Sequence, residues 1–324
     1  MPLVGTTIFT DPDGFRTSLQ GSKIEFVFTD GGNFSARATS LELPNLRLLY
    51  TQEHLSRIAF ISLAPEQAFI SLPMRFDAPP IFDGIKLKLG DIIFHGIGDR
   101  VHLRTKGKSD WAFISSAPTY LAKFGKILTG ADLVPPPGGR ILRPAANAAT
   151  SLRATIAKAS RIAKTRAEVI THRECVRSIE QELLHALIAC LTADDALANN
   201  ARRHHVSIMA RFEAVLSAHP DRQLRMGVLC KAIGTPERTL RVCCAEVLGM
   251  GPSRYGRLRR LNLARSALAH RNATKLKVAE AAARYGFSEP GRFAVVYRSV
   301  FGESPSTTLW RSGTAAQRQF AEYA

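Results

Sequence analysis

The chain has 324 residues, of which 45% are hydrophobic and 22% charged, and its formal net charge is +17 at pH 7. This length predicts about two domains, each large enough to bury a core of its own. No apolar stretch approaches the ~20 residues that span a bilayer, and no basic segment followed by an apolar one opens the chain. We therefore expect neither a membrane-spanning nor an exported protein.

The positive charge is concentrated in the C-terminal part of the chain. Residues 201–324 hold 21 Lys and Arg against 8 Asp and Glu, residues 140–200 hold 9 against 6, and residues 1–139 hold 14 against 13. A solvated basic face and a footprint for nucleic-acid phosphates are the two interpretations of such an excess. The basic residues are spread over several expected helices, which argues against a single membrane-binding stripe.

Short runs with strand-like composition, separated by turn residues, occupy the region from Ile24 to about Ser115. Strands this short and closely spaced predict an antiparallel barrel or sandwich. The expected strands cover residues 24–28, 34–43, 46–50, 56–63, 67–72, 85–89, 91–95 and 110–115. A helix is expected over residues 118–130, and the run Pro135 to Gly139 is expected to end the domain as a stiff, exposed linker.

Three helical stretches follow, over residues 148–168, 171–192 and 202–218. The second stretch places an apolar stripe on one side, made of Cys175, Ile179, Leu183, Leu184, Leu187 and Leu191. This stripe either packs against the β-rich domain or forms a helix–helix dimer surface. The sequence does not separate these two alternatives.

An internal repeat follows residue 220. Residues 226–234 align with residues 278–286, and residues 249–253 align with residues 302–306. Between these landmarks each copy has an apolar set at helical spacing, which is Leu240, Cys244, Val247 and Leu248 in the first copy and Phe293, Tyr297, Val300 and Phe301 in the second. A short helix, a turn at glycine and a second helix with one apolar face are typical of a helix-turn-helix, and this chain has two.

The second helix of a helix-turn-helix enters the major groove of DNA, and we expect these helices near residues 236–248 and 289–300. Two such helices reach successive grooves on one face of DNA when they lie about one helical turn, roughly 34 Å, apart. The segment 253–270 fits as a stiff spacer helix. Its seventeen or so residues at about 1.5 Å each give ~26 Å, the right order once the widths of the helices are added.

Candidate DNA contacts follow from the expected helix faces. If Leu240 and Cys244 face inwards, four residues of the first recognition helix turn outwards: Arg238, Arg241, Val242 and Ala245. Arg238 and Arg241 are the candidates for base contact, because Arg pairs in bidentate fashion with guanine O6 and N7. The alternative is that both bind phosphate only.

The second recognition helix offers a different set. Gly291, Ala294 and Val295 stand at the matching outward positions and provide no side-chain hydrogen bonds, although Val295 is placed to touch a thymine methyl group. Arg292 and Arg298 are expected to contact phosphate. Backbone amides at the helix start, around Ser288, are expected to add a phosphate anchor.

These motifs resemble the AraC/XylS transcriptional regulators. The second copy carries the pattern Val278-Ala-x-x-Ala-x-x-x-Gly286-Phe287-Ser-x-x-x-x-Phe293-x-x-x-Tyr297-Arg298-x-x-Phe301-Gly302-x-Ser304-Pro305, and the first carries Arg238-Thr-Leu240, Gly249-x-x-Pro252 and Tyr255. The resemblance covers about residues 206–313. Pro236 stands where the family usually has a capping Ser, and Val242 and Val295 stand where a polar or basic residue often lies.

The resemblance implies a bacterial, cytoplasmic activator that binds double-stranded promoter DNA and acts on RNA polymerase. It also implies that an N-terminal domain, often cupin-like, binds a small-molecule effector or forms a homodimer. The layout is most similar to the branch that contains the ethanolamine-operon activators. We therefore expect an α+β chain with a cupin-like barrel or sandwich in residues 1–135, a helical connector in 140–205, and an all-α DNA-binding domain in 206–324 whose two helix-turn-helix motifs are joined by a linker helix.

The β-rich domain has two sets of residues on which a ligand site would depend. One set is aromatic and forms either an apolar effector pocket or ordinary core: Phe60, Phe69, Phe76, Phe82, Phe94, Trp111 and Phe113. The other is His54, His95 and His102, which lack the closely spaced pair that a cupin metal site needs. We expect no metal, no cofactor and no catalytic residue, and the five cysteines are expected to be reduced buried thiols.

Two alternatives to a ligand-responsive activator remain open. One is a ligand-independent repressor or architectural DNA-binding protein whose β domain only dimerises. The other is a cupin-type enzyme or sugar-binding module with a tail that anchors it to nucleic acid. No phosphate loop, G-x-S-x-G or HExxH motif is present in the sequence, which favours a regulator over an enzyme.

Overall fold

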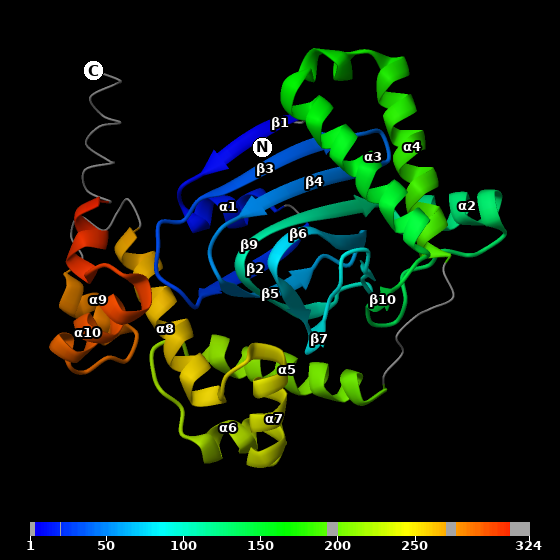
Figure 1. Cartoon of the computed structure of the whole chain (residues 1–324). Helices are drawn as coiled ribbons and strands as arrows, with labels where there is room; N and C mark the ends of the chain where they lie inside the picture. Colours follow the sequence, from blue (N-terminus) through cyan, green and yellow to red (C-terminus); the bar gives the residue numbers. More distant parts are fainter. Residues whose placement is uncertain (1–3, 20, 193–199, 270–276, 312–324) are drawn as a thin grey trace, which may run out of the picture. The chain divides into compact units, whose positions relative to one another are not determined.

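The computed structural model describes residues 4–19, 21–192, 200–269 and 277–311. The chain divides into two compact units, drawn in Figure 1. The first consists of Met1–Glu25, Phe34–His54 and Ala59–Arg203, and the second of Phe26–Asn33, Leu55–Ile58 and His204–Ala324. Within the described ranges, none of the helices combines the length and the apolar composition needed to cross a membrane.

A ten-stranded sheet lies mostly in the first unit, and the strands along its main path pair antiparallel (Figure 1). Its strands are β1 (Val4–Phe9), β2 (Ser22–Phe28), β3 (Ala36–Glu42), β4 (Leu46–Glu53), β5 (Arg57–Leu63), β6 (Ala68–Phe82), β7 (Ile85–Lys86), β8 (Ile92–Phe94), β9 (Arg100–Ser116) and β10 (Arg140–Leu142). The order is β1-β3-β4-β9-β6-β8-β10, and β5 pairs with both β2 and β9, while β7 pairs with β6. The predicted antiparallel β-rich region is confirmed.

Strands β6 and β9 are much longer than the sequence predicts. The expected strand over residues 67–72 stops short of prolines at positions 73, 79 and 80, and proline cannot donate a hydrogen bond to a ladder. In the structure β6 has 15 residues and β9 has 17. Their pairing register shifts at three places, which are Pro73/Arg75, Phe76/Ala78 and Ala78/Ile81. Irregularities of this kind accommodate the prolines within the strand.

Helices α1 (Pro12–Ser18), α2 (Pro118–Thr129), α3 (Ala146–Thr165) and α4 (Arg173–Leu191) complete the first unit. Helices α3 and α4 share one hydrophobic core with the sheet. Leu152 of α3 and Leu187 of α4 are fully buried in the same cluster as Ile70 of β6. The apolar stripe of residues 171–192 therefore packs within the β-rich unit, which is the first of the two predicted alternatives.

The prediction of an exposed linker at residues 135–139 holds only in part, because Pro137 and Gly138 are exposed and the two residues before them are not. Pro135 and Pro136 are buried, and the chain then enters β10, which pairs with β8. The Oδ2 atom of Asp99 accepts the backbone N–H of Gly139 at 2.7 Å and that of Gly96 at 2.8 Å. The proline segment is thus a fixed part of the sheet unit, and the expected helical connector begins with a strand.

The second unit contains the helices of the repeat. They are α5 (Asn200–Ala218), α6 (Met226–Ile233), α7 (Glu237–Leu248), α8 (Pro252–Ala269), α9 (Val278–Arg284) and α10 (Pro290–Phe301). The pairs α6/α7 and α9/α10 are the two predicted helix-turn-helix motifs, and α8 is the predicted linker helix. Gly249 and Gly302 end α7 and α10 at φ of 71° and 73°, a left-handed conformation that favours glycine and explains why this residue recurs in the repeat.

The predicted apolar faces form the core of this unit. Leu240 and Cys244 are fully buried, and in the second motif the rings of Phe293, Tyr297 and Phe301 form a row with centroids 5.5 and 4.6 Å apart. The strand segment included in this unit is held by a polar side chain of α8. Asn262 accepts the backbone N–H of Phe28 at 2.9 Å through Oδ1 and donates to its carbonyl at 3.3 Å through Nδ2.

We predict that Asp99→Ala destabilises the sheet unit by about 1–3 kcal/mol, because two backbone N–H groups lose a charged acceptor. Thermal or urea unfolding measures this loss. Asp132→Ala is the control, since Asp132 is exposed and its carboxylate makes no hydrogen bond or ion pair with the described residues. Equal stability of the two variants would show that Asp99 does not hold the proline segment.

Candidate nucleic-acid interface

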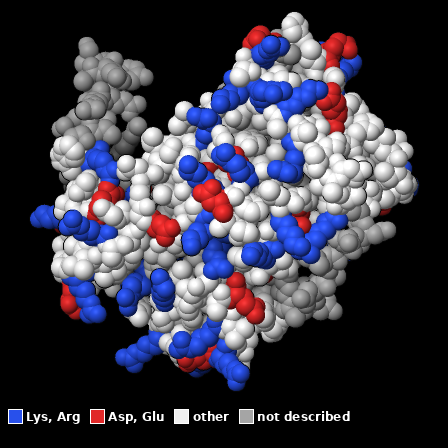
Figure 2. Space-filling model, viewed as in Figure 1, with Lys and Arg blue, Asp and Glu red and all other residues white. Residues whose placement is uncertain are grey.

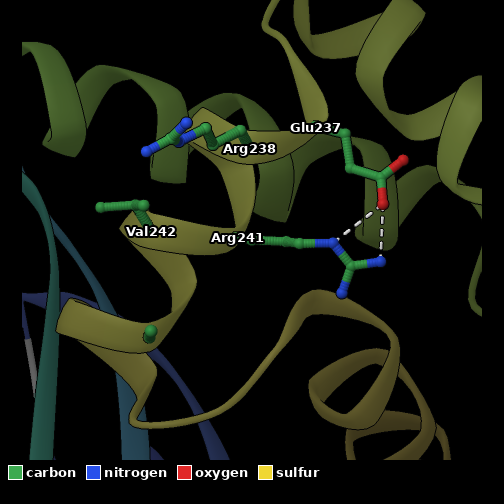
Figure 3. Close-up of a pocket in the computed structure, with 5 residues that line it drawn as sticks. Glu237, Arg238, Arg241 and Val242 are labelled. Atoms are coloured by element: carbon green, nitrogen blue, oxygen red, sulfur yellow. Dashed lines mark hydrogen bonds and ion pairs between the residues drawn. The ribbon is translucent and has the colours of Figure 1, made fainter.

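Helix α7 presents one face to solvent. Its exposed residues include the four that the sequence turns outwards, which are Arg238, Arg241, Val242 and Ala245. Together with Glu237 they line a shallow hollow on this face (Figure 3). The outward orientation is confirmed, and contact of these residues with DNA stays a prediction.

The two arginines of this face differ in their partners. The Nε and Nη2 atoms of Arg241 donate to Oε1 of Glu237 at 2.8 and 2.6 Å, an i, i+4 pair visible in Figure 3. Arg238 makes no side-chain hydrogen bond or ion pair with any residue that the structure describes. The whole guanidinium of Arg238 is therefore available to a ligand, whereas the fork of Arg241 is partly engaged.

Glu237 is a residue that the sequence analysis missed. It begins α7, where an acidic side chain stabilises the positive end of the helix dipole. The same carboxylate brings a negative charge to the face that the motif would turn towards phosphates. Its i, i+4 spacing to Arg241 was the signal that could have identified the pair.

The outward face of α10 is less polar than that of α7. Five of the predicted contact residues lie exposed on α10 or just before it, namely Ser288, Gly291, Arg292, Val295 and Arg298. Val295 is 70% exposed, against 43% for Val242 of α7. Pro290 occupies the first position of α10 and has no N–H, so it removes one of the amides expected to anchor phosphate.

Three of the arginines of α8 are structural. The guanidinium of Arg259 donates to the carbonyl of Leu216 at 3.2 Å and lies 3.6 Å from a carboxylate oxygen of Glu213. Glu213 is fully buried and also accepts the hydroxyl of Tyr255 at 2.6 Å. These bonds attach α8 to α5, and so to the first motif.

Arg260 and Arg265, the other two structural arginines of α8, connect this helix to the second motif. Arg260 donates to the carbonyls of Tyr285 and Gly286 at 2.9 and 3.1 Å. Arg265 pairs with Glu303 at 3.4 Å and lies over the ring of Phe301, with 4.8 Å to the centroid. Burial lowers the pKa of both arginines. Part of the predicted basic excess thus makes bonds within the protein that hold the unit together.

The exposed cations are spread over several helices of the second unit. Figure 2 shows Lys and Arg side chains scattered over much of the visible face of the molecule. The exposed set of the second unit is Arg211, Arg222, Arg225, Lys231, Arg238, Arg241, Arg254, Arg257, Lys277, Arg284, Arg292, Arg298 and Arg311. This distribution suits a long polyanion better than a small anionic ligand.

The cysteines and histidines do not assemble a reactive site in the described structure. Burial raises the pKa of Cys190 to about 11 and raises the pKa of Cys243 and Cys244, which opposes thiolate chemistry. All five cysteines are free, although Cys175 and Cys230 are only half-buried. No group of three or more His, Cys, Asp or Glu in the described ranges has the arrangement of a metal site.

The expected effector pocket stays a prediction. Phe69, Phe82, Phe94 and Trp111 are buried, as ordinary core would be. His95 shares a 2.8 Å hydrogen bond with the hydroxyl of Ser71, so this histidine belongs to the polar interior of the sheet.

Comparison with known proteins gives a match over the two motifs. A family model described as "Helix-turn-helix domain" matches residues 229–311. XylDLEGF operon transcriptional activator 2 of Pseudomonas putida is 31% identical over 126 residues, which are 38% of this chain and 80% of that protein. Activator 3 for the same operon is 33% identical over 134 residues, which are 40% of each chain, so the match spans less than half of that relative.

Two solved structures are similar in part. The AraC-like transcriptional activator CuxR is 15% identical, with a TM-score of 0.42, over 81% of this chain and 95% of that one. A transcriptional regulator with an AraC-type DNA-binding domain from Chromobacterium violaceum is 23% identical, with a TM-score of 0.31, over 36% of this chain and 97% of that one.

The Glu237–Arg241 pair generates a prediction. Glu237→Gln should change the unfolding free energy by no more than about 0.5 kcal/mol, because both side chains are largely exposed. It should strengthen binding to DNA of any sequence roughly two- to fivefold, because it removes a negative charge from the face of α7. Fluorescence anisotropy with labelled duplexes measures the change.

Glu246→Gln is the matched control. It removes the same charge from the same helix, outside the hollow, where Glu246 pairs with His205 at 2.8 Å. Weaker DNA binding by Glu237→Gln, with Glu246→Gln unchanged, would contradict the prediction and show that Glu237 holds Arg241 in its binding position.

Proposed function

Because the chain belongs to the AraC/XylS family, we propose that it is a transcriptional regulator that binds promoter DNA through its twin helix-turn-helix unit. The observation that carries this proposal is the pairing of α6/α7 and α9/α10 around the single helix α8. Each pair has a buried inner face and an exposed second helix. That is the arrangement by which such motifs place a helix in the major groove.

The two recognition helices differ in what they offer to DNA. Helix α7 presents Arg238, whose free guanidinium can reach both acceptors of a guanine. Helix α10 presents Val295, which suits contact with a thymine methyl group, beside Arg292 and Arg298 for phosphates. Sequence discrimination through hydrogen bonds therefore belongs mainly to the first motif, and the second contributes phosphate affinity and apolar contact.

The remaining parts of the proposal rest on the family resemblance. They are a cytoplasmic location, activation through RNA polymerase, and a regulatory role for the β-rich unit through a small effector or a homodimer. The proposal is for a regulator and not for an enzyme. A ligand-independent repressor is the alternative, and a thermal-shift screen with metabolites separates the two, because a ligand that binds the native state raises its stability.

We predict that Arg238→Ala and Arg298→Ala weaken operator binding in different ways. Loss of Arg238 should cost about 1–3 kcal/mol and relax base preference at one position of the first half-site. Loss of Arg298 should weaken all sequences about equally. Competition binding against a library of operator variants measures affinity and base preference together.

The same experiment can contradict the assignment. If Arg238→Ala lowers affinity uniformly and keeps the base preference, then Arg238 contacts phosphate. If the unmodified protein shows no preference for any duplex, the proposed function itself is wrong.

A further inference from the structure

A narrow cleft lies within the second unit, between the end of α5, the loop that leads into α6, and the start of α8. The residues that line it include four cations, Arg222, Arg257, Arg259 and Arg260, together with His219 and Ser253. None of its lining residues is Asp or Glu. We refer to it as the basic cleft.

The charge of Arg260 is not neutralised by the part of the protein that the structure describes. This residue is 5% exposed, and its partners are two backbone carbonyls and the ring of Phe287, 4.9 Å from the guanidinium carbon to the ring centroid. All of these partners are uncharged. Burying a cation without a counter-ion is costly, so the site favours an anion.

Two neighbouring arginines, Arg257 and Arg222, add further positive charge to the cleft. Arg257 lies one helical turn before Arg260, has no side-chain hydrogen bond or ion pair in the described ranges, and lowers the pKa of Arg260 further. Arg222 contacts the imidazole ring of His219, with 3.1 Å between Nη2 and Nδ1, and forms no ion pair with a described carboxylate. Arg259 is different, because Glu213 compensates its charge.

The position of the cleft adds further donors. Pro252 and Ser253 belong to the first turn of α8, where free backbone N–H groups and the positive end of the helix dipole attract anions. Arg222 and Arg257 are exposed, so their side chains are accessible to a group that enters from solvent. A tetrahedral oxyanion with several acceptor oxygens satisfies such a set of donors.

The interior of the cleft, with a volume of about 20 Å³, has room for no more than one or two water molecules. We therefore propose that a phosphoryl group binds at the entrance of the basic cleft. Arg222 and Arg257 hold its oxygens at the entrance, and Arg260 supplies the buried positive charge. The group comes either from the DNA backbone or from a free phosphorylated ligand. The first case rests on the proposed DNA-binding function, whereas the second does not.

The experiment uses the full chain and inorganic pyrophosphate as the probe. Calorimetric titration at constant ionic strength compares the unmodified protein with Arg222→Ala/Arg257→Ala and with Arg257→Ala alone. Arg254→Ala is the control, because Arg254 is an exposed arginine of the same helix outside the lining of the cleft. We expect the double substitution to weaken pyrophosphate binding at least roughly tenfold, and Arg254→Ala to change it less than about twofold.

A second set of measurements distinguishes the DNA backbone from a free ligand as the source of the phosphoryl group. If the phosphoryl group belongs to DNA, pyrophosphate competes with operator, and Arg257→Ala reduces the log–log salt slope of operator binding by about one. If it belongs to a free ligand, the salt slope is unchanged and pyrophosphate binds beside the operator. Equal loss of pyrophosphate binding in Arg254→Ala, or no binding by the unmodified protein together with an unchanged salt slope, would overturn the proposal.

A failure of the proposed function has a separate signature. In that outcome the protein binds no duplex selectively and still binds pyrophosphate through Arg222 and Arg257. That result would support the proposal for the cleft and contradict the proposal that the protein is a regulator. Circular dichroism of each variant establishes that the helices persist. Both substituted arginines are exposed, so their loss leaves the buried bonds of Arg260 in place.

Discussion

Both helix-turn-helix motifs are attached to helix α8 through three of its arginines, two of which are buried and one half-buried. Arg259 of α8 bonds to the end of α5 and to Glu213, while Arg260 and Arg265 bond to the second motif. These guanidinium groups make charge-assisted or multiple hydrogen bonds across the helix surface, which fixes orientation as well as distance. The separation of the two recognition helices is therefore a property of α8 and of the groups it binds.

This attachment explains how one polypeptide can present two helices to one face of DNA. A flexible linker would let each motif bind independently and would add affinity only through effective concentration. A stiff α8 removes that freedom before binding. The entropic cost of aligning the motifs is then met during folding, and the spacing of the two half-sites becomes a geometric consequence of the protein.

The asymmetry of the two motifs has a local physical origin. The same helical spacing that buries Leu240 in α7 and Phe293 in α10 turns Arg238 outwards in the first helix and Gly291 in the second. Similar scaffolds thus carry different surfaces. Under the proposed function, hydrogen-bonded base recognition would belong to the first motif, and apolar and phosphate contact to the second.

The repeat was predictable from the sequence because helical periodicity and terminal glycines are local signals. The helices of both motifs begin and end within a few residues of their predicted bounds. The β-rich unit was less predictable, because strand pairing depends on partners distant in the chain. The register shifts that carry Pro73 through β6, and the bonds from Asp99 to Gly96 and Gly139, are tertiary features without a local signature.

Within the candidate site, exposure of Arg238 and Arg241 followed from the apolar face opposite them, and the i, i+4 spacing was a signal for the bond between Arg241 and Glu237. The burial of Arg260 had no such signal, because it depends on packing between helices. The net charge of the sequence does not distinguish arginines that are accessible to a ligand from arginines that are bonded within the protein. The structure separates those that hold the fold from those that can meet a ligand.

Hydroxyl-radical footprinting of the purified protein on the DNA upstream of its own gene tests the central claim most directly. Two motifs held by α8 should protect two patches of backbone, centred about 10 base pairs apart on one face of the duplex. A single protected patch, or two patches whose spacing varies from site to site, would contradict a rigid attachment of both motifs to α8.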